Sequence, residues 1–192
     1  MRQTHIRLEN RSRIVAFSSV MLGLSFVGLY LGYISPSKWT FLIITSYLAY
    51  FPYLLFDSFF SGLWIVIGLN VLAYMFIPRL GYVTTFTFIS LYVPVRYLLR
   101  KLSSLFSWVF KYIYFNVAFF SWLFVQSKVL GIDILSQTAE GITKIVQLDK
   151  DLIIYGIIIF GNIFFAAYEY LFERVVQKMN TWVEKIVGKY LE

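Results

Sequence analysis

The chain has 192 residues, of which 59% are apolar and 14% are charged, and its mean hydropathy is +0.72. One globular core cannot bury so much apolar surface, so the composition predicts an all-α integral membrane protein rather than a soluble one. With no cysteine and one histidine, His5, the chain lacks the ligands of His/Cys zinc sites, haem and iron–sulfur clusters, and we expect no metal or cofactor. The net charge of the chain is +7, and its basic residues lie beside apolar segments. This placement favours anionic lipid rather than nucleic acid as the binding partner.

Six apolar segments are long enough, or nearly so, to cross about 30 Å of hydrocarbon as helices. They cover residues 14–34, 39–56, 59–77, 80–95, 104–127 and 152–172. Pro52 and Pro94 predict kinks in the second and fourth segments, because proline removes a backbone donor. The fourth segment is short and rich in threonine, so the sequence leaves open whether 80–95 spans fully.

The distribution of basic residues tests the number of spans. With six spans, 11 Lys and Arg residues lie on the amino-terminal side and 5 on the opposite side. If 80–95 did not cross, the division would become 7 against 9. The charge pattern therefore predicts six spans with both termini on the cytoplasmic, or equivalent inner, side.

Two further stretches have helical periodicity. From Leu135 to Val146 apolar residues recur at spacings of 4, 3 and 4, which predicts a short amphipathic helix on the far surface before the last span. Residues 173–192 carry a wider apolar stripe, which favours an amphipathic helix in the membrane interface, with a coiled coil as the alternative. The predicted organisation is one membrane-embedded domain, 1–192, with a basic tail over 1–13, a six-span bundle over 14–172 and this carboxyl-terminal helix.

Two charged residues fall inside predicted spans, where charge is costly and often functional. Lys111 in the fifth span and Glu169 in the sixth lie near the same membrane surface in the six-span topology. We therefore predict an ion pair that joins the two helices. The alternatives are separate snorkelling to the headgroups, or a role in conduction or proton relay.

Other polar and small residues fit structural roles. Asp57 falls between the second and third spans, where a turn or helix cap is expected. Asn70 and Asn162 lie within spans, where an amide usually bonds a neighbouring helix. Gly28 and Gly32 have the spacing that lets another helix approach closely, and the sequence leaves open whether that helix belongs to the same chain.

Seven basic residues on the predicted inner side are expected to contact anionic headgroups. They are Arg2, Arg7, Arg11, Arg13, Arg96, Arg100 and Lys101. No catalytic motif is present, so the sequence favours a non-catalytic accessory or scaffolding subunit of a membrane complex, with lipids and other membrane subunits as partners. The alternative is a small channel or transporter with a polar path near Lys111 and Glu169.

Overall fold

The computed structural model describes residues 11–146 and 149–189, and all regular structure in this part of the chain is helical. Seven α-helices and one π-helical turn, η1, follow one another in the order α1 Arg11–Ile34, α2 Lys38–Phe56, α3 Phe59–Phe76, α4 Leu80–Leu99, α5 Ser104–Phe124, η1 Val125–Val129, α6 Ile134–Val146 and α7 Lys150–Lys189. Within the described residues, five stretches are long and apolar enough to cross a membrane. They are Val15–Ile34, Lys38–Phe56, Phe59–Phe76, Ser104–Val129 and Lys150–Trp182. Their length and composition favour a multi-pass membrane protein.

The helix α4 is not among these five stretches, although it has 20 residues and extends past the predicted boundary at Val95. Its composition is less apolar because it carries hydroxyl groups and Arg96. The hydroxyls of Thr84 and Thr85 donate to carbonyl oxygens one turn earlier in the same helix, at 2.8 Å each. Half of its residues are buried, so α4 needs less apolar surface than a helix that faces lipid on most sides. Both α4 and α2 continue past their prolines.

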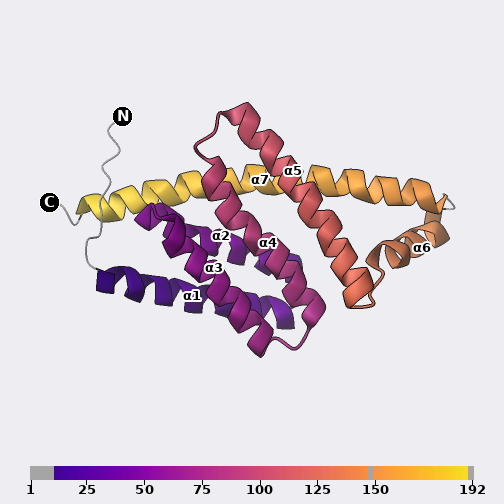
Figure 1. The fold of residues 1–192 in the computed structure, drawn as a ribbon, viewed down its shortest axis with the longest axis horizontal. Helices are drawn as coiled ribbons and strands as arrows, with labels where there is room; N and C mark the ends of the chain where they lie inside the picture. The colour runs from indigo at the N-terminus through magenta and orange to yellow at the C-terminus, as the bar shows by residue number, and fades with distance from the viewer. Residues whose placement is uncertain (1–10, 147–148, 190–192) are drawn as a thin grey trace. The chain divides into compact units, whose positions relative to one another are not determined.

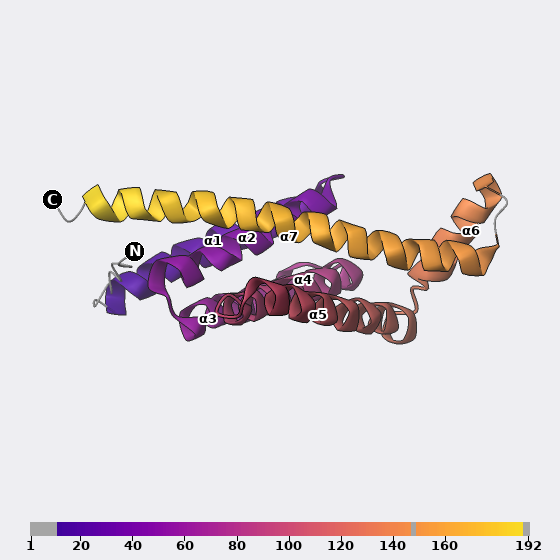
Figure 2. The same cartoon turned by 90° about the horizontal axis from the view of Figure 1, so that it is seen from above.

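The chain divides into two compact units, 1–101 with 172–192, and 102–171. In the first unit, α1 and α2 lie side by side, and α3 and α4 lie against one side of this pair (Figures 1 and 2). The rings of Phe17 and Phe56 are in contact, 5.7 Å between centroids, and Gly28 lies beside Thr45, so α1 and α2 are antiparallel. The single membrane-embedded domain stays a prediction.

The second unit contains α5, η1, α6 and the first half of α7. The rings of Phe115 and Phe165 stack at 4.5 Å, and contacts on either side of them pair later residues of α5 with earlier residues of α7. The two helices are therefore antiparallel. The short helix α6 has the predicted period: Ala139 on its apolar face is buried and Glu140 on its polar face is exposed.

The last helix differs from the prediction of a span ending near Phe172 and a separate tail helix. In the structure α7 is one unbroken helix of 40 residues (Figure 1). No glycine or proline occurs between Phe172 and Val187, and Glu, Arg, Gln, Lys and Met are good helix formers, so nothing in the sequence ends the helix there. The tail is helical as predicted up to Lys189, and 190–192 lie outside the described residues.

Candidate functional site

A buried charged contact within the second unit joins α5 to α7. Lys111 Nζ lies 2.5 Å from Glu169 Oε1, and the side chains are 10% and 0% exposed. The Lys111 ammonium also lies 5.5 Å from the centre of the Trp108 ring, one turn earlier in α5. The structure thus brings together the two intramembrane charges that the sequence singles out. Opposite charges at this distance lower the electrostatic penalty of placing each group in an apolar span.

A second polar contact lies further along the same two helices. Asn116 Nδ2 donates to Asn162 Oδ1 at 3.0 Å, and Asn162 Nδ2 donates back to Asn116 Oδ1 at 3.3 Å. Each amide also donates to a carbonyl one turn earlier in its own helix. Asn162 could be predicted as a helix-packing residue from its place in a span, but its partner Asn116 was not predicted. The order of the residues could have indicated this partner, because Asn116 follows Lys111 in α5 while Asn162 precedes Glu169 in α7, the order expected of two pairs on antiparallel helices.

In the first unit, Asn70 joins α3 to α4. Its Nδ2 donates to Ser90 Oγ at 2.9 Å and to the Val66 carbonyl oxygen at 2.8 Å. This contact is the helix-to-helix bond expected of an amide within a span. The hydroxyl of Ser90 in turn donates to the carbonyl oxygen of Thr87 at 3.0 Å.

The glycines of α1 pack against other helices of the same unit. A Cβ atom at Gly28 would lie 3.2 Å from Thr45 Oγ1 of α2. At Gly32 it would lie 2.5 Å from the Cβ atom of Phe41 in α2 and against the hydroxyl of Tyr82 in α4. That hydroxyl donates to the carbonyl oxygen of Leu29 at 3.0 Å. The small residues therefore allow close packing within the chain.

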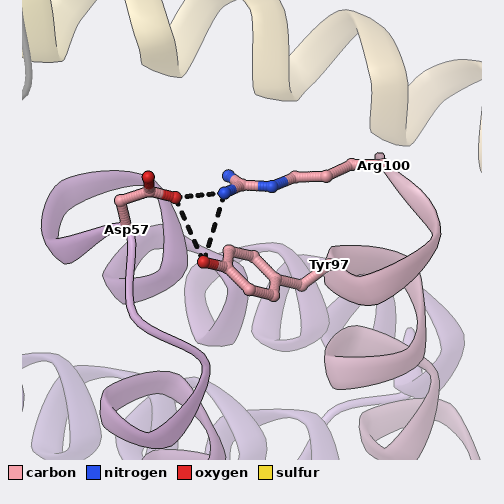
Figure 3. Close-up of polar contacts among 3 residues, drawn as sticks. All are labelled: Asp57, Tyr97 and Arg100. Carbon is pink, nitrogen blue, oxygen red and sulfur yellow. Dashed lines mark hydrogen bonds and ion pairs between the residues drawn. The ribbon is translucent and has the colours of Figure 1, made fainter. Parts of the chain in front are cut away.

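Asp57 belongs to a three-residue polar cluster with Tyr97 and Arg100 (Figure 3). The Tyr97 hydroxyl donates to Asp57 Oδ1 at 3.1 Å, and Arg100 forms an ion pair with the same oxygen. Arg100 also donates to the Tyr97 hydroxyl at 3.2 Å, and its guanidinium lies 4.0 Å from the centre of that ring. The cluster joins the α2–α3 turn to the end of α4.

In the α2–α3 turn, Asp57 ends α2 and Ser58 caps α3. Asp57 ends α2 in the left-handed conformation, with φ 44°, while Ser58 Oγ accepts from the Ser61 backbone N–H at 3.4 Å and caps α3. Asp57 is therefore a turn residue as expected, and its carboxylate also contacts α4. Residues 40 positions apart give no local sequence signal for this contact. The Tyr97–Arg100 spacing of three residues on one helix was the only available indication.

We expect Asp57→Asn to lower the free energy of unfolding by about 0.5–1 kcal/mol, because the ion pair is partly exposed and such pairs are weak. Thermal unfolding in nanodiscs measures the change. Arg100→Gln should add little in the Asp57→Asn background, whereas the exposed neighbour change Lys101→Gln should have little effect in either background. Additive effects of Asp57→Asn and Arg100→Gln would show that the two side chains are not coupled.

The basic residues expected at the headgroups have different surroundings. Arg96 is buried, and its guanidinium lies 4.4 Å from the centre of the Phe172 ring and 5.2 Å from that of Tyr50. Arg100 is partly exposed within the Asp57 cluster, and Lys101 is exposed. The other predicted contacts lie outside the described side chains: Arg2 and Arg7 precede the described residues, and only the backbone of α1 is described at Arg11 and Arg13.

Outside the spans, Asp133 caps α6 by accepting a hydrogen bond at 3.1 Å from the Ser136 backbone N–H. This bond lowers the pKa of the Asp133 carboxyl below its ordinary value, since it stabilises the charged form. Across the described residues, no three or more His, Cys, Asp or Glu side chains group in a way that could hold a metal ion. Comparison with known proteins gives no match: no family model, no curated protein and no solved structure matches the chain.

Proposed function

We propose that this chain is a non-catalytic, multi-pass membrane protein that acts as an accessory or scaffolding subunit of a larger membrane complex. The observation that carries the proposal is the use of intramembrane polar side chains to join helices. Lys111 pairs with Glu169, Asn116 with Asn162, and Asn70 with Ser90. Polar contacts between helices stabilise a helix bundle in lipid. The hydrophobic effect does not, because an apolar side chain is as well solvated by lipid tails as by another helix.

The exterior of α5 supports the same proposal. Large apolar side chains follow one another along its exposed face at spacings of four and three residues: Phe106, Phe110, Ile113 and Val117. The same helix turns Ser107 and Lys111 inward. Such a face suits acyl chains or an apolar helix of a neighbouring subunit.

We further infer six spans, with α4 as the fourth. A helix of 20 residues is about 30 Å long, which matches the hydrocarbon thickness. At its start, Tyr82 bonds Leu29 near the end of α1, and just past its other end, Arg100 pairs with Asp57 at the end of α2. Because α1 and α2 are antiparallel, these ends lie at opposite ends of the unit, so α4 extends along its whole depth. The predicted charge division supports the same topology, with both termini on the inner side.

Native mass spectrometry of the full chain, extracted in nanodiscs together with whatever binds it, tests the subunit proposal. We expect a complex in which other membrane proteins are present in fixed ratio to this chain. Re-extraction with a harsher detergent serves as the control, because an adventitious neighbour loses its fixed ratio before a true subunit does. A protein that is only ever a monomer or homo-oligomer would contradict the proposal.

A channel or transporter is the second candidate, because a buried ion pair such as Lys111–Glu169 can also form part of a proton or ion path. Proton and ion flux into sealed proteoliposomes distinguishes the two. Flux that depends on Lys111 and Glu169 would favour transport. A subunit should give no flux above that of empty vesicles.

A further inference from the structure

Several buried polar atoms of the first unit have no hydrogen-bond partner within the described residues. They are Ser18 Oγ, Ser25 Oγ, Thr45 Oγ1, Tyr53 Oη and Asn70 Oδ1. Ser25 and Thr45 are 0% exposed. A buried hydroxyl or amide oxygen without a partner destabilises the folded state, so five such atoms in one small unit require an explanation.

Three of these atoms lie at a similar depth on three different helices. Gly28 lies beside Thr45 Oγ1, and Ser25 lies one turn before Gly28 on α1. Gly62 packs against the Tyr53 ring. Thr45 lies eight residues before Tyr53 in α2, and Asn70 lies eight residues after Gly62 in α3, so these antiparallel helices carry Thr45 and Asn70 at the same level.

The other two atoms lie toward one end of the unit. Ser18 precedes Ser25 by seven residues, two turns on the same face of α1. Tyr53 lies one turn from the end of α2, and Phe17, next to Ser18, contacts Phe56 at that end. The unpaired oxygens therefore run from the α2–α3 end of the unit to the level of Thr45.

We propose that the first unit binds ordered water at the level of Ser25, Thr45 and Asn70, and that this water extends to Ser18 and Tyr53 toward the α2–α3 end. A buried water makes two to four hydrogen bonds to otherwise unsatisfied groups, and hydroxyl and amide oxygens supply these. A cation would need a compensating negative charge at this depth, and the five residues are all neutral. The proposal adds a hydrated site to the chain and does not depend on its role as a subunit.

Magnetisation transfer from water protons, measured by solid-state NMR on the isotope-labelled full chain in lipid vesicles, tests the proposal directly. The exposed residue Ser37 is the positive control, and Val66, which is 0% exposed and apolar, is the negative control. We expect transfer at Ser25 and Thr45 close to that at Ser37. Transfer as low as at Val66 would overturn the proposal.

Matched variants give a second, independent readout. Thr45→Val removes a hydroxyl that would hold water, whereas Thr84→Val removes a hydroxyl of another buried threonine that bonds its own helix at 2.8 Å. We expect Thr45→Val to shift the unfolding equilibrium roughly fivefold toward the unfolded state and to reduce water transfer at Ser25. If Thr45→Val left the protein unchanged or stabilised it, while Thr84→Val did not, the hydroxyl would have no water partner and the proposal would fail.

Discussion

Lys111→Met should lower the free energy of unfolding by about 3 kcal/mol or more, because it removes a cation 2.5 Å from a carboxylate that stays fully buried. Glu169→Gln should have an effect of the same sign, since it leaves the lysine buried in an apolar span. Reversible unfolding in mixed detergent measures both changes. The matched control is Lys128→Met, which makes the same substitution at an exposed lysine after the same helix, where we expect a change within about 0.5 kcal/mol.

The double variant Lys111→Met with Glu169→Gln separates pairing from simple burial. When both charges are removed, neither is left buried, so the double variant should be more stable than the sum of the single effects predicts. Additive effects would mean that the two side chains do not interact. If Lys111→Met left both stability and assembly unchanged, the ion pair would have no structural role.

Gly32→Ala should lower the free energy of unfolding by about 1–3 kcal/mol, because α1 has no room for a methyl group at this position. The added carbon would lie 2.5 Å from the Cβ atom of Phe41, which cannot move away by changing rotamer. Relief requires α1 to shift from α2, and that shift strains the bond from the Tyr82 hydroxyl to the Leu29 carbonyl. Thermal unfolding of the variant in nanodiscs measures the loss.

The matched control is Gly23→Ala on the same helix, where an added Cβ atom meets nothing within 4 Å. Alanine has the higher helix propensity, so Gly23→Ala should be neutral or slightly stabilising. Equal destabilisation by both substitutions would show that backbone flexibility, and not packing, is what the glycines of α1 contribute. The contrast also tests whether Gly32 packs within the chain, since a contact between chains would make the effect of Gly32→Ala depend on protein concentration.

Much of the helical pattern could be predicted from the sequence, because apolar length and charge are properties of short segments. The same reasoning brought Lys111 and Glu169 to one membrane surface, since each charge has few acceptable positions in a span. The helix α4 continues to Leu99, past the end of the predicted span at Val95, because a helix need not end where its sequence becomes charged. The prediction of a separate helix after Phe172 was wrong for a similar reason. The sequence becomes more polar there, but it contains no residue that would end the helix.

Contacts that depend on packing could not be predicted. Asp57 reaches Tyr97 and Arg100 only because α4 returns beside the turn that follows α2, and no local pattern carries that information. The same applies to Gly32, whose neighbours come from two other helices. Arg96 is a basic residue near the end of a predicted span, which is typical of a headgroup contact. In the structure its guanidinium instead lies over the rings of Tyr50 and Phe172 in the interior of the unit.

The six-span topology is the central claim, because the charge division and the placement of both termini depend on it. The chain has no cysteine, so single cysteines at Ser37, Ser103 and Thr138 can be labelled with an impermeant maleimide in sealed, oriented vesicles. All three positions are exposed. The six-span account predicts that Ser37→Cys and Thr138→Cys label from one side and Ser103→Cys from the other. Labelling of Ser103→Cys from the same side as Ser37→Cys, with Thr138→Cys opposite, would show that α4 does not cross the membrane and would contradict the account.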